Sequence, residues 1–139
     1  MRQRLGCIGL IVLTGCAAVP ASKPMLAPPQ IAAAQADEAS NGLTQALVQG
    51  QLLVVTLPSN PSTGYRWRWR IEGQPVVQPD GDPAFAVSVD TDRVGAAGNE
   101  RWLLRAQQAG QGRLVFEYYR PWEQGLPLRE LVFPVQVRG

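Results

Sequence analysis

Apolar and polar residues alternate in several short segments from residue 43 onward, and a period of two predicts β-strands. The clearest segment is 65–71, where two Trp, a Tyr and an Ile point to one face and three Arg point to the other. No long segment in this part of the chain shows the 3.6-residue period of a helix. The predicted strands are 43–48, 52–57, 65–71, 85–89, 102–106, 114–119 and 131–137.

Seven short strands separated by turns rich in Gly, Pro and Asp predict an all-β domain over residues 43–139. The strand number and the length favour an immunoglobulin-like antiparallel β-sandwich, with a small closed barrel as the alternative. Large aromatic side chains fall on the inward faces of these strands and are expected to build the core. They are Trp67, Trp69, Phe85, Trp102, Phe116, Tyr118 and Phe133.

The first residues have the pattern of a secretory signal. A basic start is followed by an apolar run over 5–13, which is too short to span a bilayer. The next tetrad, Leu13-Thr14-Gly15-Cys16, resembles the lipobox of bacterial lipoproteins, which implies a signal peptide over 1–15 and fatty acyl chains such as palmitate on Cys16. The alternative is an ordinary signal peptide cleaved near Ala17 or Ala18. The lipoprotein interpretation implies a lipid-anchored protein of the bacterial cell envelope. An Asp directly after the lipidated Cys is associated with retention in the inner membrane. This chain has Ala17 at that position, so we expect localisation to the outer membrane.

Residues 16–42 are rich in Ala and Pro and contain no aromatic residue, which is the composition of a flexible linker. Residues 31–39 could form a short helix, but an isolated helix of that length is marginal in water. The predicted organisation is therefore a signal peptide, a linker that starts at the lipidated Cys16, and a sandwich domain from residue 43.

Removal of residues 1–15 changes the charge and the cysteine count. Arg2 and Arg4 leave, so 13 basic residues become 11 and equal the 11 acidic ones. A neutral chain has no basic excess to attract nucleic acid. Cys7 leaves as well, and because Cys16 is the proposed lipid acceptor, no internal disulfide can form. The domain must be stabilised by its core alone.

Several kinds of chemistry are excluded by composition. The chain has no His, which rules out His-dependent triads and most zinc sites, and it lacks the glycine patterns that cradle nucleotides. Four carboxylates could pair in principle, but they lie in turn-like contexts where solvation is the usual role. They are Asp80, Asp82, Asp90 and Asp92. We therefore expect a binding domain without a metal or cofactor, and not an enzyme.

Polar, small and aromatic residues outside the alternating pattern gather in three loops. These are NPSTGY at 60–65, VGAAGNE at 94–100 and YRPWEQG at 119–125. Because strand direction alternates along the chain, these three connections are expected to leave the sandwich at the same end. In the first loop, Pro61 restricts the backbone and Gly64 allows a close return into the next strand. In the third, Trp122 has no core position to fill, and Trp and Arg are enriched at interface hot spots.

These motifs, in this order and spacing, resemble the chagasin family of protein inhibitors of papain-like cysteine peptidases. The family pattern is Asn-Pro-Thr-Thr-Gly-Tyr, then Gly-X-Gly-Gly, then Arg-Pro-Trp, on an immunoglobulin-like sandwich. The chain departs from it at Ser62, which keeps a hydroxyl, and at Ala97, which replaces a Gly. If position 97 needs a positive φ, Ala costs about 1 kcal/mol or more there.

The resemblance implies a monomeric, non-covalent and reversible inhibitor that wedges three loops into the active-site cleft of a papain-like cysteine peptidase. Ser62 and Thr63 would occupy the catalytic centre, and Trp122 would pack on an apolar wall of the peptidase. The alternative is a membrane-anchored adhesion or assembly module that binds an envelope protein or a glycan through the same loop end. The peptidase-binding residues implied by the family are Asn60, Pro61, Ser62, Thr63, Gly64, Tyr65, Gly95, Ala96, Ala97, Gly98, Arg120, Pro121 and Trp122.

Overall fold

The computed structural model describes residue 15 and residues 31–87 and 95–139. The chain divides into two units, and the unit Ile31–Gly139 is the folded domain. It consists of two β-sheets packed face to face, so the sandwich prediction is confirmed over the barrel. The predicted signal peptide, apart from Gly15, and the predicted lipid acceptor Cys16 lie outside the described residues.

The described residues form nine strands and two short 3-10 turns. No helix in the described part of the chain is long and apolar enough to cross a membrane. In chain order the elements are β1 (Ala34–Asp37), η1 (Glu38–Ser40), β2 (Gln45–Val48), β3 (Leu52–Ser59), η2 (Pro61–Thr63), β4 (Arg66–Gly73), β5 (Val77–Pro79), β6 (Ala84–Val87), β7 (Gly98–Ala106), β8 (Gly110–Tyr119) and β9 (Arg129–Arg138).

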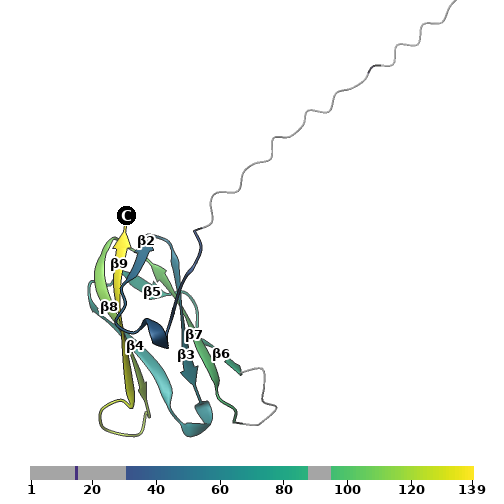
Figure 1. Cartoon of the computed structure of the whole chain (residues 1–139), viewed down its shortest axis with the longest axis vertical. Coiled ribbons are helices and arrows are strands. Elements are labelled where there is room, and N and C mark those ends of the chain that lie inside the picture. Colours follow the sequence, from purple (N-terminus) through teal and green to yellow (C-terminus); the bar gives the residue numbers. More distant parts are fainter. Residues whose placement is uncertain (1–14, 16–30, 88–94) are drawn as a thin grey trace, which may run out of the picture. The chain divides into compact units, whose positions relative to one another are not determined.

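One sheet has the strand order β1-β3-β7-β5, with β6 also paired to β7, and the other has the order β2-β9-β8-β4 (Figure 1). The long central pairs, β3·β7, β4·β8 and β8·β9, are antiparallel as expected. Two pairs at the edges are parallel instead, β1·β3 and β2·β9. Each sheet therefore has one parallel edge strand, which comes from the N-terminal part of the domain. The sandwich is mixed and not purely antiparallel as predicted.

The predicted linker is too long, because the folded unit begins at Ile31 and not at Leu43. Residues 34–37 form strand β1, so the short helix considered for 31–39 does not form there. Ala36 pairs with Val55 of β3 and is only 3% exposed. An Ala-rich segment of four residues carries no clear period, and its strand is decided by pairing with β3. The three-residue strand β5, which pairs with β7, was also not predicted, because three residues are too few to show a period.

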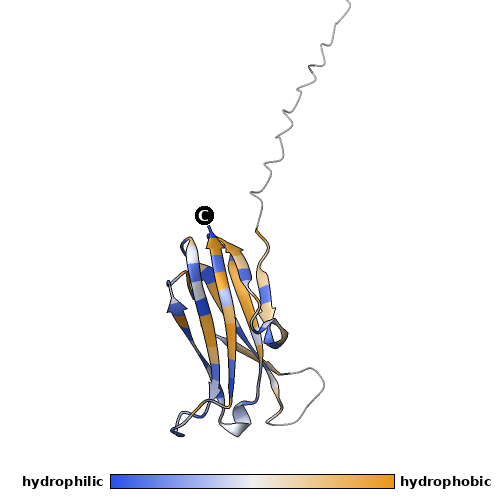
Figure 2. Cartoon of the chain, turned by 60° about the vertical axis from the view of Figure 1, so that its left-hand side comes forward, coloured by the Kyte–Doolittle hydropathy of each residue, from blue (hydrophilic) through white to orange (hydrophobic). Residues whose placement is uncertain are grey.

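The core lies between the two sheets, where the apolar positions of the central strands gather (Figure 2). Four of the seven predicted core aromatics are buried, and Trp69 and Trp102 pack against the core while partly exposed. Phe85 is the exception, with 41% of its surface exposed. It lies on β6, which among the described strands pairs with β7 alone. Every core residue that the structure describes belongs to the unit from Ile31 to Gly139, so this unit has a hydrophobic core of its own.

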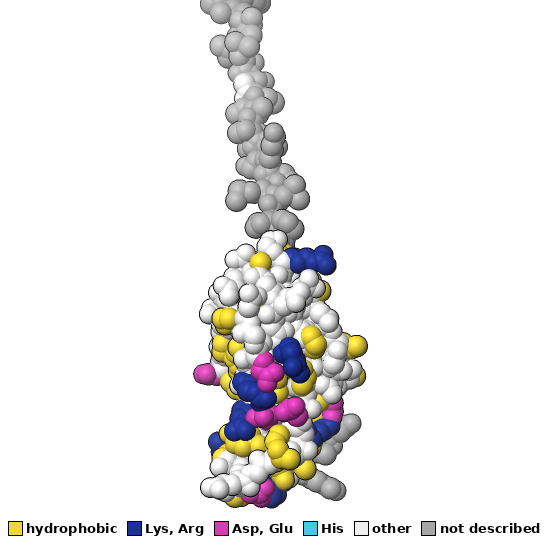
Figure 3. All heavy atoms as spheres, turned by 90° about the vertical axis from the view of Figure 1, so that its left-hand side faces the viewer, with side chains coloured by type: hydrophobic (Ala, Val, Ile, Leu, Met, Phe, Trp, Pro, Cys, Tyr) yellow, Lys and Arg dark blue, Asp and Glu magenta, His cyan; other side chains and the backbone are white. Residues whose placement is uncertain are grey.

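Charged side chains cross the outer face of the sheet that contains β4, β8 and β9 (Figure 3). Glu117 accepts hydrogen bonds from Arg68 Nε and Arg70 Nη1, both at 2.5 Å, and is itself almost buried. Burial opposes ionisation of Glu117, but the bonds from the two arginines outweigh it and hold its pKa below the ordinary value. This outward-facing carboxylate is therefore a structural anchor for the β4·β8 pair.

Candidate functional site

The three loops meet at one end of the sandwich, opposite the C-terminus (Figure 1). Ser62 Oγ in the first loop contacts the carbonyl oxygen of Gly95 in the second at 3.2 Å, sharing its one proton between this oxygen and the nearer Asn60 Oδ1. Arg120 Nε in the third loop donates to the carbonyl oxygen of Thr63 in the first, at 3.2 Å. We call residues 60–65, 95–98 and 120–128 the three-loop tip. Val94, Asp90 and Asp92 lie outside the described residues.

The first loop is a capped 3-10 turn. Asn60 is its N-cap, and its Oδ1 accepts hydrogen bonds from the Ser62 backbone at 3.2 Å and from Ser62 Oγ at 2.5 Å. The carbonyl oxygen of Asn60 accepts from the backbone N–H of Thr63 at 3.1 Å and from Thr63 Oγ1 at 2.6 Å. Pro61 occupies the first position of the turn, where its missing N–H costs nothing. The closely spaced Asn, Pro, Ser, Thr and Gly residues of this loop thus give it one defined conformation. Ser62 and Thr63 are exposed at its apex.

Gly64 serves two purposes at the end of this turn. Its φ of 79° lies in the left-handed region, which a residue with a side chain rarely adopts. The indole of Trp122 also covers its Cα, since a Cβ at this position would be 2.8 Å from Trp122 Cζ2. Trp122 nevertheless keeps 67% of its surface exposed. The first and third loops therefore interlock while a large apolar face remains available.

An aromatic column connects the tip to the core. The rings of Trp67 and Tyr118 lie 4.8 Å apart, those of Tyr118 and Tyr65 stack at 5.1 Å, and the guanidinium of Arg120 sits 4.3 Å above the Tyr65 ring. The first loop is tied to this column because the Asn60 N–H donates to the Tyr118 hydroxyl at 3.0 Å. Tyr65 is thus a support for the tip and is only partly exposed.

The second loop approaches β6 closely at its end. Gly95 has a φ of 83° and lies against Ser62, whereas Gly98 begins β7 and is buried. A Cβ on Gly98 would overlap the carbonyl of Ala86 and the ring of Phe85, so a glycine is required there for space. Ala96 is partly exposed and Ala97 is exposed, so the methyl group that departs from the family pattern points out of the fold.

The third loop is fixed at both ends. Arg120 Nη1 pairs with Glu123 Oε1 at 2.8 Å, and the Leu128 N–H donates to the Tyr118 carbonyl at 2.9 Å. Leu126, at its far side, is 97% exposed. Sequence reasoning missed this residue, although a large apolar residue beside Pro127 in a loop gives the same signal as Trp122 beside Pro121.

The described residues of the tip form no constellation for covalent chemistry. Ser62 Oγ contacts oxygen atoms of Asn60 and Gly95, and no residue that the structure describes places a base beside it. Among the described residues there is no group of His, Cys, Asp and Glu that could hold a metal ion. Asp80, one of the candidate carboxylates, pairs with Arg105 at 2.5 Å. The arrangement is suited to binding: hydroxyl groups and backbone at the centre, with an exposed Trp and Leu on one side.

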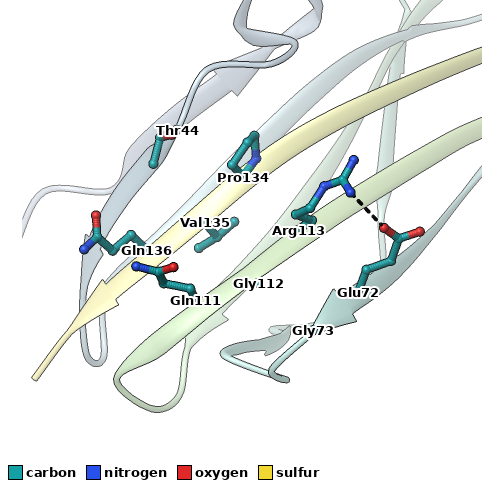
Figure 4. Close-up of a pocket in the computed structure, with 9 residues that line it drawn as sticks. All are labelled: Thr44, Glu72, Gly73, Gln111, Gly112, Arg113, Pro134, Val135 and Gln136. Carbon is teal, nitrogen blue, oxygen red and sulfur yellow. Dashed lines mark ion pairs between the residues drawn. The ribbon is translucent and has the colours of Figure 1, made fainter.

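A hollow of about 550 Å³ lies away from the tip, on the sheet formed by β2, β9, β8 and β4 (Figure 4). It is crossed by the ion pair of Arg113 and Glu72 at 3.5 Å. It shares no residue with the three-loop tip, and nothing in its polar lining singles out a ligand. The residues that line it are Thr44, Glu72, Gly73, Gln111, Gly112, Arg113, Pro134, Val135 and Gln136.

Comparison of the sequence with known proteins identifies relatives among peptidase inhibitors. The model of the chagasin family of peptidase inhibitors matches residues 46–137. Chagasin from Trypanosoma cruzi is 33% identical over 90 residues, which cover 61% of this chain and 79% of chagasin. Amoebiasin-2 from Entamoeba histolytica is 31% identical over 96 residues, which cover 63% of this chain and 71% of that protein.

Solved structures show the same fold. The crystal structure of a cysteine protease inhibitor from Entamoeba histolytica superposes with a TM-score of 0.71 at 26% identity, over 80% of this chain and 100% of the other. The structure of PbICP-C in complex with falcipain-2 superposes with a TM-score of 0.51 at 22% identity, over 76% of this chain and 91% of the other. At that identity the second likeness concerns the fold alone.

Proposed function

Because the chain belongs to the chagasin family of peptidase inhibitors, which is a family of inhibitors and not of enzymes, we propose that it inhibits papain-like cysteine peptidases reversibly and without a covalent bond. The family and its relatives favour this function over an adhesion or assembly module. The observation that carries the proposal is the tie of the first loop to both of the others, through Ser62 with Gly95 and Arg120 with Thr63.

A preorganised tip explains why such a surface would bind tightly. Ordering a flexible loop at an interface costs free energy, and a loop that is already held in its bound shape avoids most of that cost. Here the first loop is fixed by its cap, by the Tyr118 hydroxyl and by Arg120 before any partner arrives. The tip then enters the cleft as one wedge.

Each loop has its own part in the proposed complex. Ser62 and Thr63 lie over the catalytic centre of the peptidase, where they block the nucleophile without presenting a scissile bond in reactive geometry. Residues 95–98 run along the cleft with main-chain contacts. Trp122 packs on an apolar wall, and Leu126 extends that contact. Arg120 and Pro121 hold Trp122 in place.

Titration of papain with the domain, residues 31–139, tests the proposal. We expect complete, reversible loss of activity at sub-micromolar concentration of the domain. Trp122→Ala should weaken binding by at least ~2 kcal/mol, as expected of an interface hot spot. Val48→Ala, a similarly apolar position on β2 that lies outside the tip, is the matched control and should leave inhibition unchanged. Full papain activity in excess domain would rule out the function, and binding to a glycan or envelope protein would then favour the adhesion module.

We further propose that Cys16 carries fatty acyl chains and anchors the domain to a bacterial envelope membrane, the outer membrane being the expected one. The sequence Leu13-Thr14-Gly15-Cys16 supports this. Labelling of expressing cells with a palmitate analogue should mark the wild-type chain and not Cys16→Ser. Equal labelling of both chains, or of neither, would contradict the anchor and leave the inhibitory function untouched.

A further inference from the structure

Strand β6 presents apolar side chains to solvent beside the three-loop tip (Figure 1). Its four residues, Ala84–Val87, are all exposed, and none of them is charged. The two large side chains are Phe85, which is 41% exposed, and Val87, which is 52% exposed. Proteins commonly protect an exposed edge strand with charged side chains. An edge that lacks this protection and carries exposed apolar side chains indicates a surface that a partner covers.

The pairing of β6 with β7 decides which way these two side chains point. Phe85 lies opposite Glu100, and Val87 lies opposite Gly98. Residues directly opposite each other in an antiparallel pair share a face of the sheet. Phe85 and Val87 therefore lie on the face that also carries Glu100 and Trp102. Because Gly98 has no side chain, its position leaves Val87 uncovered.

An open hollow of about 310 Å³, which we call the side hollow, lies on this same face. Its lining joins three parts of the molecule. Pro61, Gly64 and Trp122 come from the three-loop tip, Trp102 comes from β7, and Pro83 directly precedes β6. Its volume is at the lower end of the range of small-molecule pockets, about 300–1,000 Å³. It can therefore admit one large side chain.

The buried polar atoms of the side hollow are closed to an entering group. Oε2 of Glu100 and Nε1 of Trp102 are both fully buried. Oε1 of Glu100 already accepts a hydrogen bond from Ser59 Oγ at 3.4 Å. The charge of Arg66, which also lines the hollow, belongs to an exposed side chain and can stay in water when the hollow is filled. With its tryptophan and proline lining, the side hollow suits an apolar side chain.

We propose that the side hollow, together with Phe85 and Val87, is a second docking site for the peptidase and receives an apolar side chain from the rim of its cleft. This inference rests on the function proposed above and extends the interface beyond the three-loop tip. The partner follows from continuity, because Pro61, Gly64 and Trp122 belong both to the tip and to the side hollow. A peptidase wall that packs on Trp122 thus borders the hollow as well.

Titrations of papain with two β6 variants test the proposal. Phe85→Gln should raise the inhibition constant roughly tenfold by removing an apolar contact. Val87→Thr keeps the β-branched shape that suits a strand, and we expect a rise of roughly fivefold because its hydroxyl would be buried without a partner. Val48→Thr makes the same change on another edge strand, β2, outside the tip and the side hollow, and should inhibit like wild type.

NMR spectra of the labelled domain with and without papain locate the contact directly. Binding should shift the backbone amide resonances of residues 84–87 and the indole N–H resonance of Trp102, which lies outside the tip. The amides of residues 45–48 on β2 should stay unchanged. Changes confined to the three-loop tip, or equal inhibition by wild type and both β6 variants, would overturn the second docking site while inhibition itself stands.

A second copy of this chain is the competing occupant of the same surface. Sedimentation of the free domain would then show a dimer that Val87→Thr dissociates and Val48→Thr does not, and this result would overturn the proposal. We expect a monomer in all three cases. If wild type fails to inhibit papain and its spectrum does not respond to the enzyme, the proposed function fails, and this inference fails with it.

Discussion

The indole of Trp122 occupies the space that a side chain at Gly64 would need, so the third loop rests directly on the backbone of the first. Two motifs separated by more than fifty residues are thereby joined in one contact surface. Arg120 joins the same two loops, because its Nε donates to the carbonyl oxygen of Thr63. A change at either residue should therefore be felt by both loops.

Gly64→Ala should weaken inhibition by at least ~2 kcal/mol, because the new methyl group displaces the Trp122 ring. Part of the damage will be backbone strain of about 1 kcal/mol, since φ at this position is 79°. Gly42→Ala separates the two effects: Gly42 has the same φ, and a Cβ added there would meet no other atom within 4 Å. Papain titrations and thermal melts of both variants measure the outcome. Equal inhibition by the two variants would show that the contact with Trp122 is unimportant.

Arg120→Lys should weaken inhibition by about 1 kcal/mol while leaving the charge of the tip unchanged. Lysine cannot reproduce both the hydrogen bond to the Thr63 carbonyl and the planar stacking on Tyr65. The loss should appear as faster amide hydrogen exchange in residues 61–65 and as a higher inhibition constant. Arg129→Lys, a surface arginine that pairs with Glu38, provides the control. Unaltered exchange in the first loop would mean that Arg120 does not support it.

Leu126→Gln should raise the inhibition constant of papain roughly tenfold if this side chain extends the apolar contact of Trp122. The substitution preserves size and removes only the apolar character of a residue that is 97% exposed, so the stability of the free domain should not change. Leu43→Gln makes the same change at a residue that is 61% exposed and lies outside the tip. Identical inhibition by the two variants would place Leu126 outside the interface.

Glu117→Gln should destabilise the domain by about 1 kcal/mol at neutral pH, a modest figure because both arginine partners are about half exposed. The pKa of Glu117 is lowered in the folded state, so its contribution is complete above the ordinary pKa of Glu and is lost as pH falls through the lowered value. The difference in unfolding free energy between wild type and Glu117→Gln should therefore shrink in acid. Urea unfolding across a pH series measures it. Glu130→Gln, whose carboxylate lies 3.9 Å from Arg70, should have little effect at any pH.

The alternation of apolar and polar residues was sufficient to predict most strands of the sandwich. The alternation in β4, β8 and β9 predicted which faces are buried, and the structure confirms this for Trp67, Phe116 and Phe133. The motifs also predicted which loops share an end, because strand direction must alternate along antiparallel neighbours. Where the pattern was short or Ala-rich, as in β1, the prediction was wrong: the segment forms a strand because β3 offers it a partner.

By itself, then, the sequence determined the period of each long strand, the order of the three loop motifs and the absence of histidine chemistry, since these are properties of neighbouring residues. Only the tertiary structure decided that Phe85 lies on an exposed edge, that Trp122 rests on Gly64 and that Glu100 turns inward beneath the tip. The reason is physical: a strand's own period says which residues share a face, whereas burial and contact depend on which other strand or loop comes to cover that face.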